Sequence, residues 1–131
     1  MTEFLYHRRV QFAETDAAGI VHFANYLRYM EEAEHAMWRA AGLSIRPPSS
    51  EIGWPRVAAS FDFSRALRFE DEFEIAIRVD KMSKRSIRYA CALIKDDLEI
   101  ARGTMTIACV RSDPKPHAVE IPPEIVERLQ R

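Results

Sequence analysis

Apolar and polar residues alternate along the chain with two different periods, which predict one long helix among several strands. From Tyr6 to Ala13 a first strand is predicted, because two sets of residues alternate: Tyr6, Arg8, Val10 and Phe12 with His7, Arg9, Gln11 and Ala13. From Asn25 to Gly42 apolar residues recur every three or four positions, the spacing of one helix face. The residues of this face are Tyr26, Met30, Ala33, Met37, Ala40 and Ala41. We expect Asn25 to cap the helix and Gly42 to end it.

The period returns to two in the second half of the chain, after a proline-containing segment that ends at Pro55. Four strands are predicted there, and they include residues 57–63, 73–79, 87–93 and 105–109. The pair Asp96-Asp97 is typical of a turn between two of them. A closing segment from Pro123 to Gln130 has room for a last helical turn or two.

The order and the short connections of these elements predict an α+β fold. Short connections favour antiparallel pairing, because parallel strands need crossovers of about a dozen residues or more. The single helix, with its one apolar face, then packs against one face of a curved antiparallel sheet of about five strands. The 131 residues are expected to form one domain over residues 1–131.

The nearly balanced charge of the chain argues against partners, such as nucleic acid, that bind through a strong overall electrostatic field. Nineteen Lys and Arg oppose twenty Asp and Glu, a formal net charge of −1, so no binding of nucleic acid is expected. The N-terminus lacks the order of a signal peptide, and the uncharged stretch from Ala17 to Leu27 is too short for a membrane span. Cys91 and Cys109 lie in alternating apolar runs and are expected to be buried free thiols. A cytoplasmic protein is therefore expected.

The residues with the clearest capacity for chemistry lie in the loop that leads into the predicted helix. Asp16 stands near the helix N-terminus, whose free backbone N–H groups can polarise a carbonyl or hold an oxyanion. A carboxylate there can act as a base for water or as a nucleophile, and Gly19 permits a tight turn. The alternative is structural, since Asp often caps a turn. Composition alone favours this structural role for Asp16.

The same loop carries a resemblance to a known family. The segment Asp16-x-x-Gly19-Ile20-Val21-x-Phe23-x-Asn25-Tyr26 resembles the signature of the 4-hydroxybenzoyl-CoA thioesterase family, acyl-CoA hydrolases with the hotdog fold. Weaker matches follow in the same order, at Gly53-x-Pro55, Ser60-Phe61, Lys84-Arg85-Ser86 and Glu120-Ile121-Pro122. The resemblance extends from Gln11 to Val126 and implies the hotdog form of the α+β fold predicted above.

This resemblance implies roles for individual residues. Asp16 matches the catalytic aspartate, Gly19 the turn glycine, and Phe23 the position whose backbone N–H polarises the thioester carbonyl. A further set of matching positions is expected to bind the substrate: Ile20, Val21, His22, Asn25, Tyr26 and Glu31. Two of these depart from the family, because Glu31 replaces a shorter aspartate and His22 replaces a large aromatic residue. The implied reaction uses no metal and no cofactor, with coenzyme A as part of substrate and product.

Basic residues at the start of one strand are expected to bind the phosphates of coenzyme A. The family match is Lys84-Arg85-Ser86, and Lys81 and Arg88 lie close to it in sequence. The alternative is a solvated strand edge, because basic residues there discourage edge-to-edge aggregation.

Acidic residues of the predicted helix offer weaker candidates. Glu32-x-x-His35 has the spacing of a di-iron motif, but such sites need four helices, so an exposed helix face is favoured. Glu34 falls among apolar positions and is expected to be a paired, partly buried structural carboxylate. The four histidines lack the spacing of a zinc site, and no metal site is predicted.

The sequence therefore predicts an acyl-CoA thioesterase that splits an acyl-CoA into a free acid and coenzyme A. A single helix leaves strand edges and apolar surface uncovered, so we expect a homodimer within a homotetramer, as the resemblance also implies. The alternative function is a non-catalytic acyl-CoA binding or scaffold protein of the same fold. A hotdog hydratase is less well supported, because that reaction calls for an Asp–His pair and a different loop.

Overall fold

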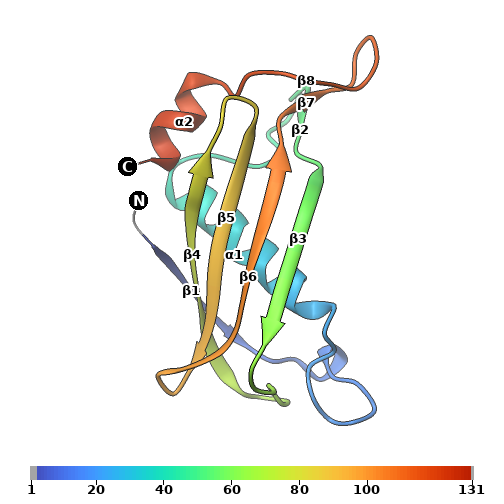
Figure 1. Ribbon diagram of the computed structural model, residues 1–131, viewed down its shortest axis with the longest axis vertical. Helices are drawn as coiled ribbons and strands as arrows, with labels where there is room; N and C mark the ends of the chain where they lie inside the picture. Colours follow the sequence, from blue (N-terminus) through green and yellow to red (C-terminus); the bar gives the residue numbers. More distant parts are fainter. Residues whose placement is uncertain (1–2, 131) are drawn as a thin grey trace.

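Five long strands and one long helix form the framework of the computed structural model, which describes residues 3–130 (Figure 1). The elements in chain order are β1 (Phe4–Arg9), the short 3-10 helix η1 (Phe12–Glu14), α1 (Asn25–Ala40), β2 (Ile52–Gly53), β3 (Arg56–Phe63), β4 (Glu72–Met82), β5 (Ser86–Lys95), β6 (Leu98–Ala108), β7 (Val110–Arg111), β8 (His117–Ala118) and α2 (Pro123–Leu129). The long strands form one antiparallel sheet in the order β1-β4-β5-β6-β3, and α1 lies against one of its faces. The predicted α+β fold is confirmed.

The core lies between α1 and the sheet face that it covers. Alternate residues of β4 and β5 point into it, as the period of two predicts, and they are Phe73, Ile75, Ile77, Val79, Ile87, Tyr89, Cys91 and Leu93. The buried apolar residues of α1 are Tyr26, Tyr29, Met30, Ala33, Met37 and Trp38. Cys91 and Cys109 are buried free thiols, which confirms the prediction for both.

The edge strand β3 borders the candidate site described below. It pairs with β6 on one side, and no strand within residues 3–130 pairs with its other side. Its contact with β6 requires Gly103, because a Cβ at that position would lie 2.5 Å from the carbonyl oxygen of Ser60. Val57 and Phe63 are 60% and 50% exposed on this strand. β3 therefore presents apolar side chains at an unpaired sheet edge.

The prediction of a first strand from Tyr6 to Ala13 was wrong at its C-terminal end. β1 stops at Arg9, although the next residue, Val10, is fully buried. The chain turns there because the Glu14 carboxylate accepts a hydrogen bond of 2.7 Å from the backbone N–H of Gln11. Phe12 consequently begins η1 and is 73% exposed, which alternation could not indicate.

The ends of α1 also differ from the prediction. Ala24 is the N-cap and Asn25 the first helical residue, so the predicted capping role of Asn25 was wrong. Gly42 ends the helix with a φ of 78°, as predicted. Ala40, predicted on the buried face, is exposed, because it lies in the last helical turn and borders a surface hollow beside Arg128.

Most of the remaining elements follow the prediction. Asp96 and Asp97 form the β5–β6 turn, both with positive φ, and α2 occupies the closing segment. β6 begins at Leu98 and is longer than the strand predicted around 105–109, and the small sheet β2-β7-β8 was not predicted. None of the helices formed by residues 3–130 has the length and apolar character that a membrane crossing requires.

Candidate active site

The loop between η1 and α1, at the lower right of Figure 1, is closed by hydrogen bonds across its base. Thr15 and Val21 face each other in an antiparallel bridge. Inside this bridge the Asp16 N–H donates to the Ile20 carbonyl at 2.8 Å, and the Gly19 N–H donates to the Asp16 carbonyl at 2.9 Å. Gly19 has a φ of 82°, a conformation that other residues adopt only under strain. The predicted turn role of Gly19 is confirmed.

The two oxygens of the Asp16 carboxylate have different surroundings. Oδ1 accepts hydrogen bonds from the backbone N–H groups of Ala18 at 2.9 Å and Ile20 at 3.4 Å, so Asp16 does cap its own turn. No group of residues 3–130 donates a hydrogen bond to Oδ2. The capping bonds fix the carboxylate, and the second oxygen remains available to water or substrate.

A cleft of about 390 Å³ lies beside the Asp16 carboxylate. It is lined by Asp16, Ile20, Val21, Phe23, Tyr26, Phe63, Ser64, Arg65 and Ala66. The Tyr26 ring forms one wall and contacts the Phe63 ring edge-on, with ring centroids 4.9 Å apart. The structure thus brings Ile20, Val21 and Tyr26, three of the predicted substrate-binding residues, together around an apolar space next to a carboxylate.

The segment that leads into α1 offers a free backbone donor. The Ala24 N–H donates to Nδ1 of His22 at 3.1 Å, and the Asn25 N–H donates to the His22 carbonyl at 2.9 Å. The Phe23 N–H donates to no acceptor among residues 3–130. His22 is exposed, and its ring stacks on that of Phe23 at 4.6 Å rather than lining the cleft. Of these amides, Phe23 is the one that can bind an incoming carbonyl oxygen.

Behind the loop lies an ionic network that the sequence did not predict. The Glu14 carboxylate accepts hydrogen bonds from Arg8 and, at 2.9 Å, from the Tyr29 hydroxyl. Arg8 also pairs with Glu32 at 2.7 Å and lies over the Tyr29 ring. Burial acts to raise the pKa of the Glu14 carboxyl, but the hydrogen bonds from Arg8, Gln11 and Tyr29 outweigh it and lower this pKa. The spacing Gln11-x-x-Glu14, that of a capping box, was the sequence feature that could have indicated a fixed Glu14 side chain.

A second ionic cluster joins α1 to the beginning of β3. The Arg56 guanidinium binds both oxygens of Glu34, at 3.1 and 2.6 Å, and one oxygen of Glu31 at 3.0 Å. The ion pair with Arg56 confirms the predicted pairing of Glu34, but the Glu34 side chain is fully buried and not partly buried as predicted. Burial, followed by the nearby Glu34 carboxylate, raises the pKa of Tyr89 well above its usual range. Glu31, predicted to bind substrate, is instead held by Arg56 and does not line the cleft.

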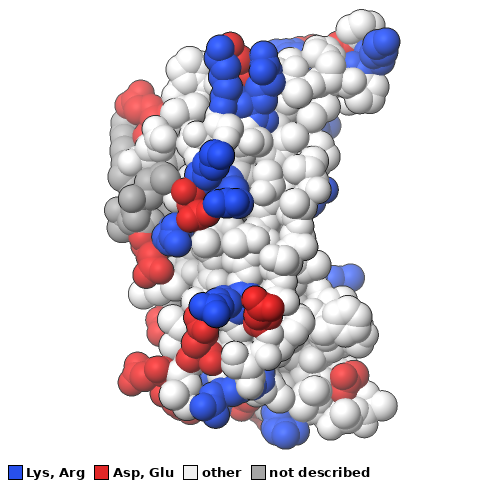
Figure 2. All heavy atoms as spheres, viewed as in Figure 1, with Lys and Arg blue, Asp and Glu red and all other residues white. Residues whose placement is uncertain are grey.

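The basic segment Lys84-Arg85-Ser86 lies in and after the β4–β5 turn, at the end of the sheet opposite the Asp16 loop (Figure 1). Lys84 is 71% exposed and approaches Glu120 at 3.4 Å. Lys and Arg side chains gather at this end of the uncovered sheet face (Figure 2). Within one chain, the structure does not bring this segment and Asp16 into one site.

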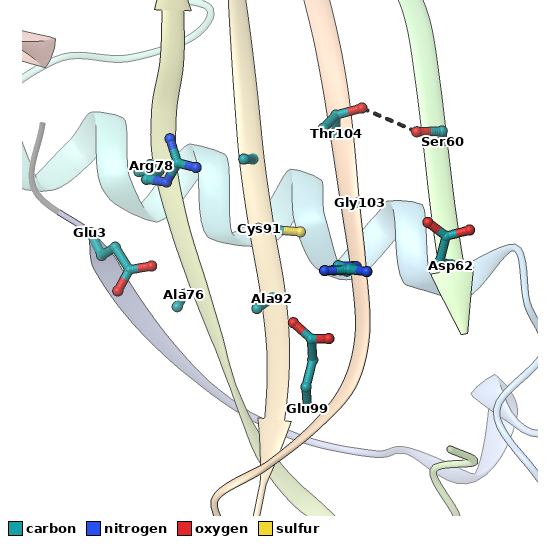
Figure 3. Close-up of a pocket in the computed structure, with 12 residues that line it drawn as sticks. Glu3, Ser60, Asp62, Ala76, Arg78, Cys91, Ala92, Glu99, Gly103 and Thr104 are labelled. Atoms are coloured by element: carbon teal, nitrogen blue, oxygen red, sulfur yellow. Dashed lines mark hydrogen bonds between the residues drawn. The ribbon is translucent and has the colours of Figure 1, made fainter. Parts of the chain in front are cut away.

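A second hollow, of about 370 Å³, lies on the sheet face that α1 does not cover (Figure 3). Small residues such as Ala76, Ala92 and Gly103 form its floor, and the Ser60 and Thr104 hydroxyls bond across it at 3.1 Å. Charged side chains surround it, but the strands beneath it are paired along their length. Such a floor lacks the free backbone N–H found at Phe23, so the Asp16 cleft remains the candidate active site.

Comparisons with known proteins identify the family of the chain. The sequence profile of the thioesterase-like superfamily matches residues 10–129. A protein of Aquifex aeolicus whose name places it among the esterases is 34% identical over 97% of this chain and 98% of its own length. A gentisyl-coenzyme A thioesterase of solved structure is 30% identical, with a TM-score of 0.83 over 96% of this chain and 99% of that chain.

The fold itself extends to more distant proteins. The crystal structure of a 4-hydroxybenzoyl CoA thioesterase mutant is 20% identical and has a TM-score of 0.88 over 98% of this chain and 99% of that chain. This similarity confirms the hotdog form of the predicted fold. Since the superfamily profile covers α1, the Asp16 loop and every strand of the large sheet except β1, the chain belongs to the thioesterase-like superfamily.

Proposed function

We propose that the chain hydrolyses acyl-CoA thioesters to a free acid and coenzyme A in the Asp16 cleft. One observation carries this proposal: Asp16, whose fixed carboxylate has an unpaired oxygen, and Phe23, whose N–H is free, both line the apolar cleft. The apolar walls suit an acyl group, and the two polar groups suit attack on its carbonyl carbon. The gentisyl-coenzyme A thioesterase, which is 30% identical, supports a CoA thioester as the substrate.

In the reaction, the thioester carbonyl oxygen accepts a hydrogen bond from the Phe23 N–H. Asp16 removes a proton from water, which attacks the carbonyl carbon, or Asp16 attacks this carbon itself and water then hydrolyses the anhydride. In either route the developing negative charge lies on the carbonyl oxygen, where a fixed N–H donor stabilises it. The carbon–sulfur bond breaks with its electrons on sulfur, and the CoA thiolate takes up a proton.

A panel of aromatic, short aliphatic and long aliphatic acyl-CoAs, with release of free thiol as the readout, tests the proposed function. We expect thiol release from at least one acyl-CoA and a clear order of preference among the acyl groups. Acyl-CoA that binds, as seen by calorimetry, without any thiol release across the panel would contradict hydrolysis. That outcome would instead identify a non-catalytic acyl-CoA binding protein.

The proposed active unit is a dimer that pairs two copies of β3. Exposed apolar side chains lie on this edge and in the cleft that it borders, including Val57, Phe63 and Phe23. Pairing across a two-fold axis would extend the sheet and cover them. Because the two strands would run antiparallel, the β4–β5 turn of one copy would lie at the same end as the Asp16 loop of the other. A site shared between two chains would therefore bring the Lys84-Arg85-Ser86 segment of one chain to the Asp16 loop of the other.

We expect Val57→Asp to give monomers without hydrolytic activity, because a charge near the beginning of the pairing edge would be buried without a partner. Leu5→Asp is the matched control, since Leu5 is 55% exposed on β1, at the opposite edge of the sheet. Light scattering over a dilution series, with activity measured in parallel, compares the oligomeric state and the activity of the two variants. A fully active monomer would contradict the shared site. The same data report whether dimers pair into the predicted tetramer.

We expect the double variant Lys84→Ala/Arg85→Ala to raise the Michaelis constant at least about 10-fold and to change turnover little. Both cations are proposed to bind the CoA phosphates and not the reacting carbonyl. Added salt should raise the Michaelis constant of the unmodified protein more than that of the variant. Arg39→Ala/Lys115→Ala removes the same charge from other exposed positions and serves as the control. An unchanged Michaelis constant at low salt would return Lys84 and Arg85 to the role of a solvated strand edge.

A further inference from the structure

A single oxygen atom joins the two halves of the candidate site. The Glu14 carbonyl oxygen accepts a hydrogen bond from the Asn25 side-chain amide at 2.9 Å and another from the His22 backbone N–H at 2.9 Å. Glu14 lies two residues before Asp16, and His22 lies directly before Phe23. The hydrogen bonds therefore connect the segment that carries the carboxylate to the segment that carries the oxyanion donor.

We infer that Asn25 is a positioning residue, which sets the distance between the Asp16 carboxylate and the Phe23 N–H by holding the Glu14 carbonyl. This inference rests on the proposed function and gives Asn25 a role different from the substrate binding that the family resemblance implies. Asn25 is partly buried, its side-chain amide donates a hydrogen bond to the Glu14 carbonyl, and it does not line the Asp16 cleft.

Both ends of the Asn25–Glu14 hydrogen bond are anchored. Asn25 is the first residue of a helix of 16 residues, so its backbone moves with α1. The Glu14 side chain is held by Arg8 and by the Tyr29 hydroxyl, which prevents its carbonyl from drifting. The segment between these anchors is a short loop, exposed at residues 16–19 and 22–24, with Val21 buried and hydrogen-bonded to the Leu67 carbonyl. A change in the length of this hydrogen bond therefore displaces Asp16 relative to Phe23.

The substitution Asn25→Asp keeps the size of the side chain but removes its N–H donor. Near neutral pH the carboxylate faces the Glu14 carbonyl, and two acceptors repel each other. A displacement of about 1 Å at a reacting group can lower turnover about 100-fold. In acid the new carboxyl takes up a proton and regains a donor, an O–H, toward the same carbonyl. The ratio of variant to unmodified turnover should therefore rise as the pH falls.

The titratable and charged groups around position 25 are common to both proteins. They are Glu14 from η1, Asp16 and His22 from the loop, Arg8 from β1, and Tyr29 from α1. Their own titration largely cancels in the ratio of the two turnover numbers. Asn25→Leu, which has neither a donor nor a charge, should lose activity at every pH and separates the missing donor from the added charge. Arg28→Gln changes the net charge by the same amount at an exposed position of α1 and serves as the control.

The experiment measures turnover and the Michaelis constant of these variants between about pH 4.5 and pH 7.5, on either side of where a raised Asp pKa would fall. We expect Asn25→Asp to lose about 100-fold in turnover near neutrality, with a Michaelis constant within about threefold of normal. The turnover ratio should recover at least about 10-fold in acid, while Asn25→Leu stays low. A thermal melt at each pH establishes that the variants remain folded.

Three results would overturn the inference: nearly normal turnover of Asn25→Asp, a ratio that does not vary with pH, or an effect on the Michaelis constant alone. Amide hydrogen exchange gives a second readout that needs no catalysis. We expect the Ile20 and His22 N–H groups to exchange at least about 10-fold faster in Asn25→Asp than in Arg28→Gln at neutral pH. If the unmodified protein hydrolyses no acyl-CoA, the proposed function fails, and unchanged exchange would separately refute the role of Asn25.

Discussion

Replacing Asp16 by Asn is expected to lower the turnover of acyl-CoA hydrolysis at least about 100-fold, the size of effect typical of a lost general base. The Asn side chain keeps a carbonyl oxygen that can accept the hydrogen bonds from Ala18 and Ile20. It cannot supply the charge that a base or a nucleophile needs. Turnover should therefore collapse while the thermal midpoint and the Michaelis constant change little.

Asp97→Asn is the matched control for this experiment. Asp97 is exposed in the β5–β6 turn and has a φ of 62°, which Asn tolerates as well as Asp does. The same chemical change there should leave turnover unaltered. Nearly normal hydrolysis by Asp16→Asn would remove Asp16 from the mechanism and leave it only its role in the turn.

The second large effect is expected on stability, from the substitution Arg56→Met. Glu34 is fully buried, and Arg56 is the cation that binds both of its oxygens. Removing one partner of a buried ion pair leaves an uncompensated charge and costs about 3–5 kcal/mol. We expect the free energy of unfolding, measured in urea, to fall by this amount.

The double variant Arg56→Met/Glu34→Leu distinguishes two causes of the lost stability: the loss of the ion pair and the buried Glu34 charge left without a partner. Replacing both members by apolar residues of similar volume is often nearly neutral, so the double variant should regain most of the lost stability. A loss below about 1 kcal/mol in Arg56→Met alone would mean that Glu34 is accommodated without its cation. Because Arg56 also holds Glu31, the single variant frees this carboxylate as well.

The sheet and the helix were predictable because their signals are local. The alternation from Phe73 to Val79 depends only on which face of a strand is buried, and the burial in the structure follows it. The turn at Gly19 was predictable because few other residues adopt its backbone conformation. The resemblance of the loop sequence then supplied roles for Asp16 and Phe23 that composition alone did not favour.

The interactions that were not predicted join residues from different elements. Arg56 lies 22 residues after Glu34, and no periodicity indicates that the start of β3 passes beside the middle of α1. The direction of the Asn25 side chain was missed for a similar reason. Its residue type fits a helix cap, but its partner carbonyl belongs to η1, whose position follows from the unpredicted turn after β1. Tertiary packing decides such contacts, and it overrides local preference.

The position of Phe63 has a consequence for attempts to change the acyl preference. Phe63 lines the Asp16 cleft and is half exposed at the β3 edge, where we propose that a second chain pairs. A library that varies this residue therefore selects on two properties at once, the shape of the cleft and the cohesion of the assembly. Variants with altered preference will include some that have merely dissociated. Substitutions at Ala66, which lines the cleft without belonging to β3, allow the two properties to be optimised separately.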